Sequence, residues 1–287
     1  MPGRHDPTLR QRRIGAELRR MREQAGFGGS HLARVLGVSP AQVTQMENGK
    51  SSVSADRLRT VAAACMCANG PLVEALAAMA SERGVRWWDE HRGSLGTPFL
   101  DVAEIEGHAE KISTYTITFI PGLLQTADYA ASVFDRAIPP LPRQAVDTRI
   151  AFRLQRQQIV RSGAVPYTAF IHEAALRMQF SGPKVLIEQL GALVQDSHHP
   201  RISIRVVRFD VKSLPGPSEN LTFAEGPVQE LDTIQIDVSH GHLILDSPAQ
   251  LASYREILAR IDSVALPEDE SRDLIQSVQK EIESKHG

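Results

Sequence analysis

The sequence predicts two folded domains: an all-α N-terminal domain of five short helices, and an α+β domain with a mainly antiparallel sheet. A length of 287 residues suits one small and one mid-sized domain better than a single core. Apolar residues recur at helical spacing early in the chain, whereas alternating and β-branched segments appear later. The composition, with 42% hydrophobic and 23% charged residues, is ordinary for a globular protein.

The N-terminal domain is expected over residues 14–84, after a flexible basic arm at 1–13. Its first helix, 14–25, has an apolar stripe and stops at Gly26. The later helices of this domain are expected at 30–36, 39–48, 54–66 and 72–83. Short helices therefore fill this part of the chain.

A tight turn joins the second and third of these helices. Gly37 lies just past the end of one helix, Ser39 is a favourable N-cap, and Pro40 suits the first turn of the next. A turn of this length fixes a steep angle between the two helices, and the small Ala33 lets them approach closely.

Charge is distributed unevenly along the chain. Residues 1–64 contain eleven Lys or Arg and five Asp or Glu, a net charge of +6. The whole chain carries −2, so residues 65–287 carry −8. A basic module on an acidic body suits a polyanionic partner, although a solvated basic helix face would give the same count.

A set of residues in this region stands at the spacing of a known family. They are Leu18, Arg22, Gly26, Leu32, Ala33, Leu36, Gly37, Val38, Ser39, Val43, Met46, Glu47, Asn48, Gly49, Lys50, Ser54, Leu58, Val61 and Ala62. On these residues, the segment 14–64 resembles the XRE-type helix-turn-helix family, which includes phage repressors. The resemblance implies binding to double-stranded DNA, with the third helix in the major groove and the second across the backbone.

The outward side chains of the third helix are then expected to face base edges. The base-contacting residues are Pro40, Ala41, Gln42, Thr44 and Gln45. Glutamine can form two hydrogen bonds to adenine, and Ala41 and the Thr44 methyl can touch thymine methyls; solvated polar side chains are the alternative for both glutamines. Phosphate contacts are expected from Arg12, Arg13, Arg34, Asn48, Lys50 and Ser51.

The resemblance also implies an ion pair between Arg22 and Glu47 with a structural role, because losing one partner would strand a charge. One departure from the family is Gly28-Gly29, where a Ser/Thr-Gln pair usually opens the second helix. We expect Ser30 to cap this helix instead. One phosphate clamp is then missing, which predicts weaker non-specific DNA affinity.

The α+β domain is expected over residues 99–287, after a linker at 85–98. Its strands are expected at 115–119, 167–171, 202–209, 221–224, 233–238 and 243–245. Its helices are expected at 100–112, 127–134, 143–160 and 183–194, with two more amphipathic helices closing the chain.

Several signatures of this second domain resemble the WhiJ-like developmental regulators of filamentous soil bacteria. They are Trp87-Trp88, the segment 120–126, Tyr129-Ala130, Arg149 near Gln157, and the segment 173–176. The resemblance implies an antitoxin-like regulator that works beside a small companion protein.

Two features of this domain are candidates for binding. Arg149, Arg153 and Arg156 lie on one basic helix and form a possible partner or ligand surface; a solvated face with internal ion pairs is the alternative. The turn from Pro121 to Tyr129 could line a pocket or an interface, or be a buried strand-to-helix turn.

Neither a catalytic residue, a metal site nor a cofactor is predicted, so we expect no enzyme. His172-Glu173 lacks the second histidine of a zinc-peptidase helix, because Leu176 stands at that position. Without a signal peptide or membrane span, the protein is expected in the cytoplasm. The sequence predicts a homodimeric, sequence-specific transcription regulator controlled through its C-terminal domain. The alternatives are an antitoxin-like protein that sequesters a companion protein and a repressor that senses a small molecule.

Overall fold

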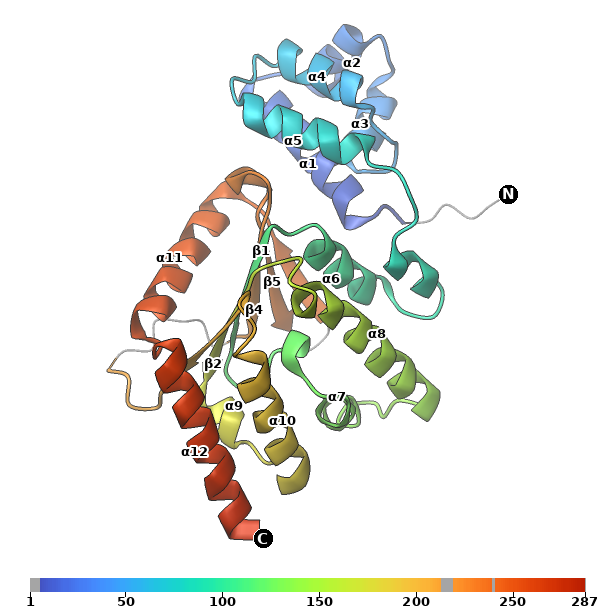
Figure 1. Cartoon of the computed structure of the whole chain (residues 1–287). Coiled ribbons are helices and arrows are strands. Elements are labelled where there is room, and N and C mark those ends of the chain that lie inside the picture. Colours follow the sequence, from blue (N-terminus) through green and yellow to red (C-terminus); the bar gives the residue numbers. More distant parts are fainter. Residues whose placement is uncertain (1–5, 213–218, 239–240, 287) are drawn as a thin grey trace. The chain divides into compact units, whose positions relative to one another are not determined.

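A computed structural model describes residues 6–212, 219–238 and 241–286, and residues 1–5 of the predicted arm lie outside them. The chain divides into two compact units, Met1–Ile105 and Glu106–Gly287 (Figure 1). The first unit is helical, with α1 (Leu9–Gln24), α2 (Gly29–Leu36), α3 (Pro40–Glu47), α4 (Ala55–Ala64), α5 (Gly70–Ser81), the 3-10 helix η1 (Trp87–His91) and most of α6 (Thr97–Gly107).

Helix α1 begins at Leu9, five residues before the predicted start, so residues 9–13 are helical and the prediction of a flexible arm is wrong for them. Thr8 causes this earlier start. Its hydroxyl accepts a hydrogen bond from the Gln11 backbone N–H at 3.3 Å, and the Gln11 side chain accepts one from the Thr8 N–H at 2.9 Å. This reciprocal capping box satisfies two N–H groups that a helix start otherwise leaves unpaired.

The core of the first unit contains one leucine or more from each of α1, α2, α4 and α5, and Val43 and Met46 from α3. The buried leucines of α1, α2, α4 and α5 are Leu18, Leu32, Leu58, Leu72 and Leu76. They follow the predicted apolar stripes. Burial of these side chains, each worth about 1.5–3 kcal/mol, holds the short helices together, since helices of this length are marginal alone.

The second unit contains, within the described residues, a six-stranded sheet in the order β3-β2-β1-β4-β5-β6. The strands are β1 (Lys111–Thr116), β2 (Tyr167–His172), β3 (Ile202–Val207), β4 (Leu221–Glu225), β5 (Thr233–Val238) and β6 (Gly241–Leu245). Strand β1 pairs in parallel with β2 and β2 with β3, whereas β1–β4, β4–β5 and β5–β6 are antiparallel. The sheet is therefore mixed, and the prediction of a mainly antiparallel sheet is wrong.

The helices between the first three strands explain the parallel pairing. The chain from β1 to β2 passes through η2 (Gly122–Leu124), α7 (Ala127–Phe134) and α8 (Arg143–Arg161), and the chain from β2 to β3 passes through α9 (Glu173–Arg177) and α10 (Pro183–Asp196). Long crossovers with helices connect parallel strands, whereas hairpins connect antiparallel ones. The sequence showed these helices, but their consequence for the sheet was missed.

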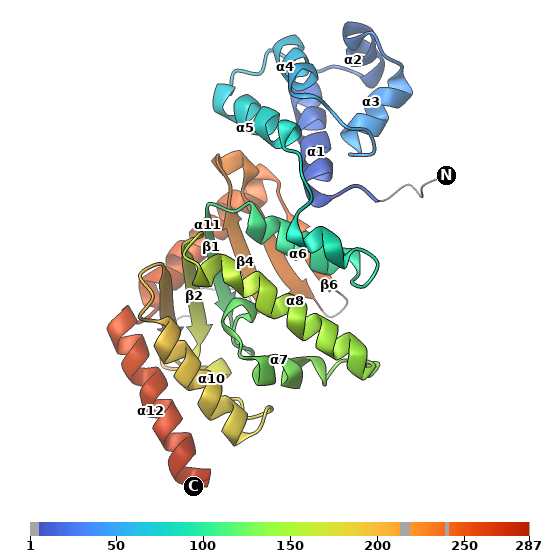
Figure 2. The same cartoon turned by 45° about the vertical axis from the view of Figure 1, so that its right-hand side comes forward.

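Helices cover both faces of the sheet. Apolar side chains of α8, α10 and α12 (Glu268–His286) form one core with β1, β2 and β3. On the other face lies α11 (Pro248–Val264) (Figure 2). Its Leu251 and Ile261 pack with Tyr115, Phe170 and Phe223. Burial from both sides removes the alternating pattern from β1, which explains why this strand was predicted four residues too late. No helix in the described ranges has the length and apolar character needed to cross a bilayer.

Candidate nucleic-acid interface

The turn between α2 and α3 has the geometry that its sequence predicts. Gly37 adopts a left-handed backbone with φ of 63° and ends α2. Ser39 then begins α3 through a second capping box: its hydroxyl accepts a hydrogen bond from the Gln42 N–H at 3.2 Å, while Gln42 Oε1 accepts one from the Ser39 N–H at 3.0 Å. The turn is therefore fixed by contacts within six residues.

The start of α2 differs from the prediction. The helix begins at Gly29, with Gly28 at the N-cap position and no side-chain hydrogen bond there. Ser30 lies inside the helix, so the prediction that it caps α2 is wrong. The first N–H groups of α2 thus have no side-chain cap, which leaves them available to an external acceptor such as a phosphate.

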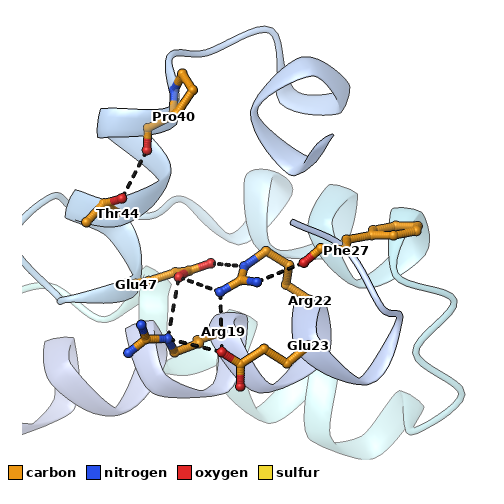
Figure 3. A network of polar contacts seen from close by, with 7 residues as sticks. All are labelled: Arg19, Arg22, Glu23, Phe27, Pro40, Thr44 and Glu47. Atoms are coloured by element: carbon orange, nitrogen blue, oxygen red, sulfur yellow. Dashed lines mark hydrogen bonds and ion pairs between the residues drawn. The ribbon is translucent and has the colours of Figure 1, made fainter. Parts of the chain in front are cut away.

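An ion pair fastens the end of α3 to α1, between the two residues that the resemblance implied. Arg22 Nε lies 2.6 Å from Glu47 Oε1, and Arg22 Nη2 lies 3.0 Å from Glu47 Oε2 (Figure 3). Arg22 Nη1 also donates to the Phe27 carbonyl at 2.8 Å. Hydrogen bonding to Glu47 raises the pKa of Arg22 above its usual value. Both side chains are largely buried, so each charge depends on the other.

A second contact between α1 and α3 was missed from the sequence. A Cβ atom on Gly15 would lie 2.5 Å from the Glu47 carbonyl oxygen and 2.6 Å from that of Met46. Gly49 is similarly close to the backbone of Gln11 and has a φ of 68°. Glycine at these two positions lets α1 approach the end of α3 more closely than any side chain would permit.

The residues predicted to contact bases lie on α3, and four of the five are exposed: Pro40, Ala41, Gln42 and Thr44. The Thr44 hydroxyl donates to the Pro40 carbonyl at 3.1 Å (Figure 3), so its hydrogen is already used within α3. Val43 and Met46 are buried and hold the opposite side of the helix in the core. The side of α3 opposite its exposed face is thus fixed by packing in the core.

Gln45, the fifth of these residues, is half-buried, and its Oε1 has no donor among the described residues. A buried acceptor without a donor costs about 1–3 kcal/mol. A partner that supplies an N–H group at this point of α3 would recover that free energy.

The residues predicted to contact phosphates fall into two groups. Arg34, Asn48, Lys50 and Ser51 are exposed, and neither Arg34 nor Lys50 makes an ion pair with any described residue. Arg12 and Arg13 are occupied instead: Arg12 bonds Asp101 at 2.6 Å, and Arg13 is 7% exposed and bonds Glu17 at 3.0 Å. Their engagement follows from the early start of α1, which places both on a helix rather than on an arm.

Comparison with known protein families assigns both units. Residues 13–76 match the family described as a helix-turn-helix domain, and residues 99–277 match a domain of unknown function, DUF5753. The chain belongs to the DUF5753 family. No curated protein and no solved structure matches it.

The three arginines singled out in the DUF5753 domain have different surroundings. Arg156 forms an ion pair with Glu106, and Arg153 donates to Gln125 Oε1 at 2.5 Å. The guanidinium carbon of Arg149 lies 6.0 Å from the centre of the Phe134 ring. None of the three is fully exposed. The Arg156–Glu106 ion pair is of the kind that the alternative expected, and a partner or ligand surface at these arginines stays a prediction.

The turn at Pro121 is buried, which confirms the second interpretation of that segment. Leu123, Leu124 and Tyr129 are at most 3% exposed. The Tyr129 hydroxyl accepts a hydrogen bond from the Ile120 N–H at 3.2 Å. Three glutamine side chains satisfy much of the remaining backbone of this turn, as described below.

Proposed function

We propose that this DUF5753 protein is a sequence-specific transcription regulator that binds double-stranded DNA through α3. The observation that carries the proposal is the exposed face of α3, which is capped by Ser39, backed by Val43 and Met46, and fastened to α1 by Glu47. A helix held in this way fits the major groove. The net positive charge of residues 1–64, and Arg34 and Lys50, which pair with no acid among the described residues, suit the phosphate backbone.

We further propose that the protein acts as a homodimer in the cytoplasm, by binding and not by catalysis. One module of this size reads only a half-site, and two modules about one helical turn apart reach the affinity that regulation needs. Control of DNA binding would come from the DUF5753 domain. The antitoxin-like alternative rests on the WhiJ resemblance, and Arg156, one of its candidate contact residues, is already bound to Glu106.

Selection of sheared genomic DNA by the purified full chain, at near-physiological salt, tests this proposal. We expect enrichment of a short palindromic sequence. Equal recovery of all fragments by folded protein would contradict it.

The enriched duplex then tests whether α3 contacts the bases. Gln45→Ala is expected to weaken binding by about tenfold, because one good base contact contributes about 1–3 kcal/mol. The measurement is fluorescence anisotropy with the selected duplex and with a scrambled one. Gln24→Ala is the matched control, because Gln24 is an exposed glutamine at the end of α1. If Gln45→Ala binds both duplexes as the wild type does, Gln45 does not face bases.

A further inference from the structure

Three arginines in this molecule each bind both oxygens of a carboxylate through the Nε–Nη2 edge of the guanidinium. Arg22 bonds Glu47 through Nε and Nη2, and Arg59 bonds Glu74 through the same two atoms at 3.0 and 2.7 Å. In the DUF5753 domain, Arg156 bonds Glu106 in the same way, with Nε 2.8 Å from Oε2 and Nη2 bonded to Oε1. The two parallel N–H groups of this edge match the two oxygens of a carboxylate.

Arg153 has the same edge without a carboxylate. Its hydrogen bond is made by the other terminal nitrogen, Nη1, which donates to Gln125 Oε1 at 2.5 Å. Arg153 Nε is buried and has no acceptor among the described residues. The described part of the chain offers Nη2 no acceptor either, and no carboxylate there lies within ion-pair distance of this side chain. The side chain as a whole remains partly exposed.

The guanidinium of Arg153 is held in place by neutral groups. Its central carbon lies over the Phe134 ring, 4.3 Å from the ring centre. Gln125 is fixed in turn, because its Nε2 donates to the Ile120 carbonyl at 2.7 Å. Gly122 adds no side chain here, and a Cβ atom at that position would lie 3.6 Å from Arg153 Nε. The unused edge is therefore oriented before any ligand arrives.

The electrostatics of this position favour one added negative charge. Burial and, to a smaller extent, the neighbouring Arg156 lower the pKa of Arg153 to about 9, although Asp237 and Glu106 oppose both effects. A cation withdrawn from water is stabilised by a paired anion. Glu106 is committed to Arg156, and Asp237 accepts a hydrogen bond from Gln235. The nearby carboxylates disfavour a dianion such as phosphate more than a single carboxylate.

We propose that the Nε–Nη2 edge of Arg153 binds the carboxylate of a small organic acid. The flat, two-point geometry selects a carboxylate, and the burial of Nε favours a small ligand over the side chain of a docked protein. A second unsatisfied atom, the buried Gln157 Oε1, belongs to the same hydrogen-bonded cluster, since Gln157 Nε2 donates to the Gly122 and Gln125 carbonyls at 3.0 and 2.8 Å. The proposal does not depend on DNA binding by α3.

Acetate is the simplest probe, and acetamide is its neutral analogue of the same shape. We would follow the Arg153 Nε–H resonance of the full-length protein by ¹H–¹⁵N correlation spectroscopy during titration with sodium acetate at constant ionic strength. A saturable shift with a half-saturation of about 1–10 mM is expected from acetate and none from acetamide or chloride. Equal responses to acetate and acetamide, or no saturable response to acetate, would overturn the proposal.

Variants test whether this edge is responsible. Arg153→Lys keeps the charge but loses the two-point geometry, so acetate affinity should fall by about tenfold, as read from backbone amide shifts around Gly122. Arg143→Lys is the matched control, since Arg143 is an exposed arginine on the same helix. Circular dichroism checks that each variant is folded. If Arg153→Lys does not fold, the comparison of acetate with acetamide on the wild-type protein tests the proposal. If Arg153→Lys binds acetate as well as the wild type does, or if Arg153 is needed only to retain a companion protein, the proposal is wrong.

Discussion

Two turns in this protein, one in each unit, are fixed in opposite ways. The α2–α3 turn is held locally, by the left-handed Gly37 and by the exchange of hydrogen bonds between Ser39 and Gln42. The turn at 120–126 of the DUF5753 domain is held by distant side chains. Local devices can be read from a short stretch of sequence, whereas the second kind requires knowledge of which helices meet.

Glutamine side chains from two helices, and one from the turn itself, fix the DUF5753 turn. Gln189 of α10 donates to the Leu124 carbonyl at 2.8 Å and accepts from the Thr126 N–H at 2.7 Å. Gln157 of α8 donates to two carbonyls of the turn, and Gln125 donates back to Ile120. A buried loop needs such partners, because its backbone groups have neither water nor a neighbouring strand.

The largest effect is expected from removing one of these distant contacts. Gln189→Ala would leave one carbonyl and one N–H of the turn unpaired and open a cavity, so the free energy of unfolding of the DUF5753 domain should fall by about 3–4 kcal/mol. Urea unfolding followed by circular dichroism measures it. Gln158→Ala, at an exposed glutamine of α8, should change stability by less than about 0.5 kcal/mol. Similar losses in both variants would show that the turn does not depend on Gln189.

A somewhat smaller effect is expected from Gly15→Ala, which tests whether only contacts between neighbouring residues hold the helix-turn-helix unit. Gly15→Ala places a methyl group 2.5 Å from the Glu47 carbonyl oxygen, 32 residues further along the chain. We expect a loss of about 2–3 kcal/mol and faster hydrogen exchange in α1 and α3, because backbone must move to admit the methyl group. Gly28→Ala is the control, since nothing lies within 4 Å of a Cβ there. Unchanged exchange in Gly15→Ala would rule out this close contact.

The smallest effect is expected from the local cap itself. Ser39→Ala removes the hydroxyl that accepts the Gln42 N–H and should cost about 1 kcal/mol of helix stability. Thermal unfolding of the full-length variant measures the decrease in Tm. Ser30→Ala, which alters an exposed serine inside α2, should have a lesser effect. Equal destabilisation of the two serine variants would show that the Ser39 hydroxyl does not stabilise the start of α3 as a cap.

The parts that sequence predicted well are those that short-range chemistry decides. Gly37, Ser39 and Pro40 place the turn and the start of α3, and the apolar stripes identify the leucine core. The Thr8–Gln11 cap has the same local character, but the prolines before it suggested an arm. The mixed sheet required combining helices with strands over about 100 residues, which no single stretch reveals.

The candidate sites divide in the same way. The exposed residues of α3 follow from helical periodicity, and the Arg22–Glu47 contact follows from the family's spacing. The buried setting of Arg153 could not be predicted, because it depends on Phe134 and Gln125 from another part of the chain. Gly15 gave no signal either, since a glycine in a helix shows its purpose only when the opposing backbone is known.

The capping role of Gln42 has a consequence for the choice of operator. A glutamine reads adenine by donating with its amide nitrogen and accepting with its amide oxygen at once. Here the oxygen already accepts the Ser39 N–H, so under the proposed function Gln42 would contact a base mainly through its amide nitrogen. Guanine N7 and O6 or thymine O4 satisfy a donor, whereas two hydrogen bonds to adenine would compete with the cap for the Gln42 oxygen. The side chain that caps the start of α3 would then also limit which bases the helix prefers at that position.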